Sequence, residues 1–268
     1  MSDVDRAAAE GLEGRVAIVT GGGAAGEGIG NGRAASLLLA EAGMRVLVVD
    51  RELALADRTV EMIEASGGEA VAFEADVTRS ASCEGMVEAA IGRWSSVDVL
   101  VNNVGVGSRG SVVDEPLETF QRVMRINVES MVLASKVAIP AMIEGGGGAI
   151  VNVSSISALR PRGLTSYSTS KGAVIALTKA MAADHGRDGI RVNCVAPGPV
   201  YTPLVYGRGM TPDAREGRRR ASLLEVEGTG WDVGNAVRFL ASARAGYITG
   251  QVVVVDGGVT VRGPSRET

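Results

Sequence analysis

Tyr167 and Lys171 stand four residues apart near the start of an apolar segment with helical spacing. At this separation two side chains project from one face of a helix, with their Cβ atoms about 5–6 Å apart. A lysine beside a tyrosine favours the phenolate, so the phenol pKa is expected to fall from its reference of about 10. The spacing predicts a proton-transferring pair that works near neutral pH. The same spacing also occurs by chance on exposed helices, so the rest of the chain has to support it.

A glycine-rich segment, 21–32, joins the apolar run 15–20 to a helical pattern over 29–42. Glycines let a backbone approach a diphosphate, whose charge is met by the amides at the start of the following helix. A flexible loop without a ligand is the alternative. The direct strand-loop-helix order favours dinucleotide binding.

Asp50 ends the next apolar run, about 20 residues after Gly30, where an acid that binds a ribose is expected. A carboxylate at this position accepts hydrogen bonds from the ribose hydroxyls and repels a 2′-phosphate. The expected cofactor is therefore NAD(H), and the adjacent Arg51 leaves some tolerance for NADP(H).

Short apolar runs and helical patterns alternate along the chain. Strands are expected at 15–20, 45–50, 70–75, 97–102, 149–154, 190–195 and 251–255. Helices are expected at 29–42, 53–66, 80–94, 117–143, 166–185 and 233–241. This alternation predicts an α/β fold of the Rossmann type, with a doubly wound, seven-stranded parallel sheet and helices on both faces.

We expect a single NAD(P)-binding domain over 1–268, with an N-terminal extension at 1–13 and an irregular segment at 203–230 that covers the substrate. Ligands of such sheets bind beyond the carboxyl ends of the strands. Residues that could do chemistry follow four strands: Asp76 and Val77, Asn102 to Gly105, Ser154 and Ser155, and Pro197 to Thr202.

Composition limits the possible partners. The chain has 268 residues and a net charge of −4 without a concentrated basic patch, so nucleic acid is not expected. No stretch looks long enough to cross a membrane, and 1–14 lacks the pattern of a secretory signal. Cys83 and Cys194 fall in helical and strand patterns, as expected of buried thiols in the cytoplasm. His185 has no second histidine or cysteine cluster beside it, so no metal site is predicted.

Together these motifs resemble the short-chain dehydrogenase/reductase family, in its compact single-domain form, from about Gly14 to Gly258. The matching pieces are the glycine loop, Asp76, Asn102-Asn103-Val104-Gly105, Asn127, Ser155, Tyr167 with Lys171, Pro197-Gly198, Ile248-Thr249-Gly250-Gln251 and Val255-Asp256-Gly257-Gly258.

The resemblance implies an NAD-dependent oxidoreductase that interconverts a secondary alcohol and a ketone by hydride transfer. Tyr167 would be the general acid and base, and Lys171 would lower its pKa and hold the nicotinamide ribose. Ser155 would hydrogen-bond the reacting oxygen. Asn127 would hold a water that links Lys171 to solvent. A strand-end hydroxyl and a helix-kink amide are the plainer interpretations of Ser155 and Asn127.

The resemblance also implies the cofactor contacts. The loop would contribute Gly21, Gly28 and Ile29. Among the strand-end residues, Asp76 and Val77 would lie at the adenine, and Asn103 and Gly105 at the riboses. Val200 and Thr202, which follow the turn at Pro197, would meet the carboxamide and phosphate.

Two departures from the family pattern leave alternatives. Six residues separate Gly21 from Gly28, where the family usually has three. A helix beginning at Ile29 is preferred to an earlier register, which would place three glycines inside the helix at about 1 kcal/mol each. The second departure concerns the catalytic serine. The number of residues that usually separates this serine from the tyrosine in the family would identify Ser154. The local sequence motif identifies Ser155, which we prefer.

Five arginines, at 208, 215, 218, 219 and 220, lie in the expected lid. A solvated helix face is preferred to contacts with an anionic substrate. Other possible functions are an NADP-dependent carbonyl or ketoacyl reductase, a non-catalytic dinucleotide-binding regulator, and an epimerase or dehydratase, although the last normally carries a larger C-terminal domain. The family also implies a homotetramer or homodimer built on the two long helices.

Overall fold

Strand β1 (Val16–Thr20) lies in the middle of a seven-stranded sheet with the order β3-β2-β1-β4-β5-β6-β7. Every pairing in the sheet is parallel. The other strands are β2 (Arg45–Asp50), β3 (Glu69–Glu74), β4 (Val99–Asn102), β5 (Gly148–Val153), β6 (Ile190–Pro197) and β7 (Val252–Val255). This computed structural model describes residues 10–207 and 209–263. It confirms the predicted Rossmann-type α/β fold.

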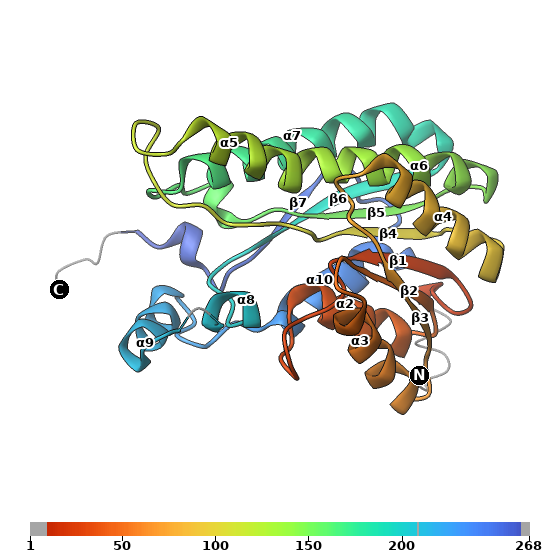
Figure 1. Ribbon diagram of the computed structural model, residues 1–268, viewed down its shortest axis with the longest axis horizontal. Coiled ribbons are helices and arrows are strands. Elements are labelled where there is room, and N and C mark those ends of the chain that lie inside the picture. The colour runs from red at the N-terminus through yellow and green to blue at the C-terminus, as the bar shows by residue number, and fades with distance from the viewer. Residues whose placement is uncertain (1–9, 208, 264–268) are drawn as a thin grey trace.

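Helices cover both faces of the sheet (Figure 1). One face carries α2 (Asn31–Glu41), α3 (Leu53–Ala65) and α10 (Gly230–Ala241), and the other carries α4 (Ser80–Trp94), α6 (Ser130–Glu144) and α7 (Thr165–His185). The central strands are buried along their whole length because both of their faces are covered. The chain reverses its strand order between β1 and β4, so their carboxyl ends form the switch point at which ligands bind.

The long helix expected at 117–143 is interrupted. It consists of α5 (Leu117–Met124), a π-helical turn over Arg125–Glu129, and α6. The span Leu117–Glu144 has a mean hydropathy of 1.4, so by length and composition it could cross a membrane, contrary to the expectation that no stretch could. The helix packs on the sheet through α6, and 44% of the residues in its most apolar window are buried.

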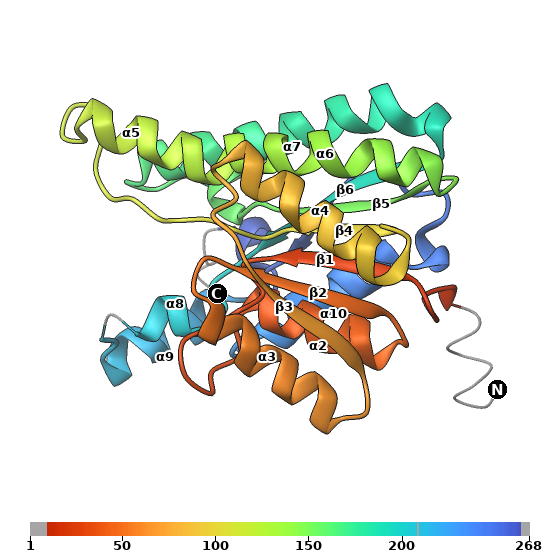
Figure 2. The ribbon, with the colours of Figure 1, turned by 45° about the vertical axis from the view of Figure 1, so that its right-hand side comes forward.

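The segment expected to be irregular contains two helices, α8 (Pro203–Tyr206) and α9 (Pro212–Ala221), which lie beyond one end of the sheet (Figures 1 and 2). The α9 helix forms because Thr211 caps it, accepting a bond from the Ala214 amide, and proline occupies its first position.

The predicted N-terminal extension lies mostly outside the described residues. Its last part belongs to the core, since Leu12 is 1% exposed. Glu10 forms an ion pair of 2.9 Å with Arg238 of α10.

Candidate active site

The start of α7 is fixed by side chains from the loop after β4. Glu115 accepts the Ser166 amide at 3.1 Å, and Ser108 accepts the Tyr167 amide at 3.2 Å. These contacts satisfy two of the amides that a helix leaves free at its first turn. Glu115 and Ser108 were not predicted from the sequence, because they lie more than 50 residues from their partners and match no cap signal.

The phenol of Tyr167 faces Ser155. Burial raises the pKa of Tyr167, and a side-chain hydrogen bond with Ser155 partly opposes the rise. The expectation that Lys171 lowers this pKa below its ordinary value is wrong, because burial raises it. The Lys171 amine lies 5.8 Å from the centre of the tyrosine ring and donates to the Val153 carbonyl at 2.9 Å, so desolvation of the phenol has the larger effect.

Lys171 is only 3% exposed. Burial lowers the pKa of its amine to about 8. A Cβ at Gly105 would lie 3.1 Å from the amine and 3.4 Å from Oδ1 of Asn127, so both polar groups face this one glycine. The structure therefore brings together Tyr167, Lys171, Ser155, Asn127 and Gly105, as the sequence predicts.

The buried amine should make stability depend on pH. Its folded-state pKa of about 8 lies below the ordinary 10.5, so between these values the unfolded chain binds more protons. Stability should consequently rise with pH across this window. In urea titrations, wild type should gain stability over Lys171→Met from pH 8 to 10.5. The control is Lys136→Met, which removes an exposed amine. If the stability difference from wild type were as independent of pH in Lys171→Met as in Lys136→Met, the buried-amine assignment would be contradicted.

Asn127 lies in the π-helical turn and is fully buried. Its Oδ1 accepts from the Val106 amide at 2.7 Å, and its Nδ2 donates to the Val106 carbonyl at 3.0 Å and to Ser170 Oγ at 2.9 Å. π-Helical turns are frequent at functional sites. The turn aims this amide at the strand-end loop, and the expected water between Asn127 and Lys171 stays a prediction.

The two candidate serines have different partners. Ser154 Oγ donates to the Lys171 carbonyl at 2.7 Å, deep below the helix. Ser155 Oγ accepts from the Ser157 amide at 3.1 Å, which leaves its own proton for another acceptor. The geometry therefore favours Ser155, because Ser154 is occupied with holding α7 against β5.

The helix after the glycine loop begins at the later of the two positions considered, as preferred from the sequence. Gly30 is the N-cap of α2 and the helix begins at Asn31, two residues after the expected Ile29. Gly21 has a φ of 64°, which favours glycine, and its carbonyl accepts from Asn103 Nδ2 at 2.9 Å. Gly32 stays inside the helix because a Cβ there would overlap the Gly21 carbonyl.

The loop fits a dinucleotide. Oδ1 of Asn31 is buried without a partner among the described residues, so this amide side chain has a free hydrogen-bonding end at the start of α2. A Cβ at Gly28 would overlap Pro203 and Tyr206 of α8, which shows that α8 lies directly on the loop. The free first-turn amides of α2 could hold a diphosphate, whereas the Asn31 oxygen, an acceptor, could take a hydrogen bond from a ligand hydroxyl.

Asp50 is held at the end of β2. Its Oδ2 accepts the Gly23 amide at 3.1 Å and its Oδ1 accepts the Glu52 amide at 3.2 Å. Arg51 is 76% exposed and pairs with Glu52 at 3.4 Å. At this position the carboxylate faces the loop, whereas the neighbouring guanidinium points into solvent.

The remaining predicted cofactor residues also lie beyond strand ends. Asp76 accepts from the Thr78 amide and hydroxyl, which lower its pKa, and Val77 is buried in the core. Pro197 ends β6, and Val200 and Thr202 after it are buried. Their backbones, rather than the Val77 or Val200 side chains, are what a ligand could contact.

Aromatic and guanidinium side chains pack together between α8 and α9. The rings of Tyr201 and Tyr206 lie 4.7 Å apart, and the Arg215 guanidinium lies 4.0 Å from the Tyr201 ring while pairing with Glu227. Arg219 and Arg220 pair with Glu216, as expected of a solvated face. Arg218 differs, since it donates inward to the Val200 carbonyl at 3.1 Å. Arg208 lies outside the described residues.

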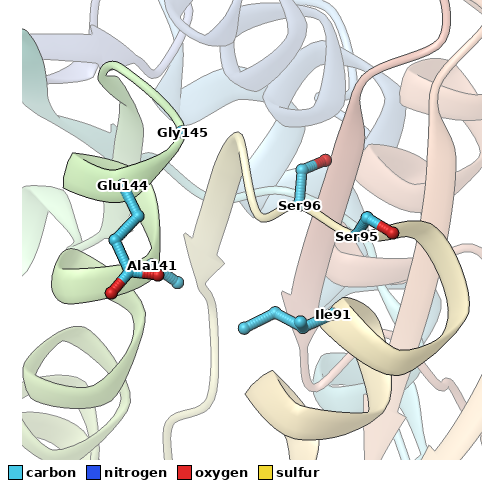
Figure 3. A pocket seen from close by; sticks show the side chains of 6 residues that line it. All are labelled: Ile91, Ser95, Ser96, Ala141, Glu144 and Gly145. Carbon is cyan, nitrogen blue, oxygen red and sulfur yellow. The ribbon is translucent and has the colours of Figure 1, made fainter.

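A shallow hollow lies at the opposite edge of the sheet (Figure 3). It is lined by Ile91 of α4, by Ala141 and Glu144 of α6, and by nearby serine and glycine residues. It contains none of the predicted site residues. Among residues 10–207 and 209–263, no three histidine, cysteine or acidic side chains group as metal ligands.

Comparison with known proteins identifies the family. The family model described as enoyl-(acyl carrier protein) reductase matches residues 22–260. A structure described as a short-chain dehydrogenase/reductase from Burkholderia xenovorans superposes with a TM-score of 0.89 at 38% identity, covering 94% of this chain and 98% of that one. The chain belongs to the short-chain dehydrogenase/reductase family, whose oxidoreductases use NAD(H) or NADP(H).

Two relatives indicate the kind of chemistry. The chain is 36% identical to 2-(S)-hydroxypropyl-CoM dehydrogenase 3 of Xanthobacter autotrophicus, over 93% of this chain and 98% of that protein. It superposes on the structure of a 7alpha-hydroxysteroid dehydrogenase complexed with NADH and 7-oxo glycochenodeoxycholic acid, with a TM-score of 0.87 and 33% identity over 96% and 98% of the two chains. The relatives are thus dehydrogenases.

Proposed function

We propose that this protein is an NAD-dependent dehydrogenase that interconverts a secondary alcohol and a ketone. The observation that carries the proposal is the partly buried phenol of Tyr167, flanked by the buried Ser155 hydroxyl and Lys171 amine at the carboxyl edge of the sheet. The glycine loop and Asp50 lie at the same edge, which supports a dinucleotide beside these groups.

The residues of this chain then divide the work. Tyr167 gives a proton to the carbonyl oxygen during reduction, or takes one from the alcohol during oxidation. Ser155 donates a hydrogen bond to the same oxygen as its charge changes. When bound, the nicotinamide supplies or accepts the hydride. Burial keeps the phenol protonated, ready to act as an acid, and the hydrogen bond with Ser155 favours the phenolate needed for the reverse step.

The proposal is tested by assaying a panel of secondary alcohols with NAD⁺ and NADP⁺ and a panel of ketones with the reduced cofactors. Turnover of at least one pair with a preference for NAD(H) supports it. Tight cofactor binding without turnover of any substrate would favour the regulator, and a preference for NADPH would favour the carbonyl or ketoacyl reductase.

Asp50→Asn should weaken the preference for NAD⁺ over NADP⁺ by at least about tenfold, because placing like charges together costs several kcal/mol. Asparagine keeps an oxygen for the Gly23 amide, so the loop bond can persist. The measurement is kcat/KM with each cofactor. Glu64→Gln, which removes an exposed carboxylate from α3, should leave the preference unchanged. An unchanged preference in Asp50→Asn would contradict the assignment of Asp50 to the ribose.

We also propose that the protein is cytoplasmic and forms a homodimer or homotetramer through its two long helices. Buried, free Cys83 and Cys194 support a reducing compartment. The long α5–α6 helix exposes Leu117, Val132 and Ile143, which support a contact with a second copy. Sizing in solution tests the assembly, and a monomer would contradict it.

A further inference from the structure

Arg33, in the first turn of α2, is fully buried. Its Nε donates to Thr59 Oγ1 at 3.0 Å, and its terminal nitrogens donate to the carbonyls of Gly26 and Gly28 at 2.7 Å each and to that of Ala24 at 2.8 Å. All four acceptors are neutral oxygen atoms. The enlarged glycine loop is therefore wrapped around one guanidinium.

These bonds fix the orientation of three peptide groups. In a planar trans peptide the N–H points opposite to the C=O. Because three loop carbonyls turn inward to Arg33, the amides of Ala25, Glu27 and Ile29 turn away from it. No described residue accepts a hydrogen bond from any of these three amides. The loop thus leaves three backbone N–H groups free for an acceptor, and free backbone N–H groups in a loop can contribute to an anion site.

Stability alone does not account for this arginine. A buried charge pays a large desolvation cost, and an apolar side chain of similar size is often as good or better for stability. Burial lowers the pKa of the Arg33 guanidinium, while the carboxylates of Glu27 and Asp50 are near enough to favour its charge. A positive charge retained here lies next to the start of α2, where the helix dipole also favours an anion.

We propose that Arg33 is a positioning residue for the cofactor diphosphate, holding the enlarged glycine loop so that the amides of Ala25, Glu27 and Ile29 are oriented in advance to bind phosphate oxygens. The inference rests on the proposed dinucleotide-dependent function. Among the described residues, Arg33 hydrogen-bonds only to the loop and Thr59, so it acts on binding and not on the chemical step.

The chain offers a matched control in Arg191. This arginine, at the opposite edge of the sheet, donates to the carbonyls of Leu240, Ala241 and Ser242 at the end of α10. Arg33→Met and Arg191→Met each remove a guanidinium that holds three carbonyls. If Arg33 were only structural, both changes would lower the Tm and neither would alter cofactor affinity.

The experiment is calorimetric titration of wild type and both variants with NADH, together with amide hydrogen exchange of residues 22–30. Arg33→Met should raise the Kd by about tenfold or more, because the loop must be ordered when the ligand binds. It should also speed exchange in the loop, with kcat at saturating cofactor nearly unchanged. Arg191→Met should keep the wild-type Kd. Arg33→Lys retains the positive charge but not the several N–H donors of the guanidinium, so it should give a Kd between those of wild type and Arg33→Met. If Arg33→Met does not fold, the Kd of Arg33→Lys tests the proposal.

A folded Arg33 variant that binds NADH as tightly as wild type would overturn this proposal and leave the proposed function standing. Failure of the wild-type protein to bind either NADH or NADPH would instead overturn the proposed function, and the role of Arg33 with it.

Discussion

Tyr167→Phe is expected to reduce turnover by about 100-fold to 10,000-fold, the usual contribution of a general acid and base. Phenylalanine keeps the ring and its packing but removes the hydroxyl that is proposed to exchange a proton with the reacting oxygen. The Kd for NADH should change little, since the helix start is held through the Tyr167 backbone by Ser108. Steady-state kinetics and NADH titration on the same preparation measure both effects.

Tyr247→Phe is the matched control, because it removes the same hydroxyl from a fully exposed tyrosine. It should retain wild-type turnover. Full activity in Tyr167→Phe would refute the assignment of Tyr167 as the acid and base, whatever the control shows.

Ser155→Ala should lower kcat by about 100-fold to 1,000-fold, as the loss of one hydrogen bond to a charged transition state does at other sites. Ser154→Ala is the neighbouring control. It removes the bond to the Lys171 carbonyl, so it should reduce the free energy of unfolding by about 1 kcal/mol and spare most of the turnover. The reverse result, an active Ser155→Ala and an inactive Ser154→Ala, would show that family spacing identifies the serine and the local motif does not.

The sheet could be predicted from the sequence because its strands are buried on both faces and appear as apolar runs, as in β1 and β4. The cluster of Tyr167, Lys171 and Ser155 could be predicted because Ser155 follows a strand and the other two lie in the first part of a helix, all at the same edge of the sheet. These features depend on local pattern and on chain topology, which a single sequence contains.

Other features depend on partners that no local pattern reveals. The direction of the Tyr167 pKa change is set by burial, which the spacing to Lys171 does not report. Glu115 contacts α7 across 51 residues, and Arg33 contacts Thr59 across 26. A buried arginine in a glycine-rich helix start resembles any surface arginine until its acceptors are known.

The hydride step itself can be followed with a secondary alcohol that carries deuterium on its carbinol carbon, chosen as the best substrate from the panel and incubated with the protein and NAD⁺. Mass spectrometry of the cofactor then measures where the label goes. NADH should gain one deuterium for each ketone formed, and Tyr167→Phe should slow this transfer without redirecting it. Conversion of the alcohol with no label in the cofactor pool would contradict the account and would favour an epimerase or dehydratase.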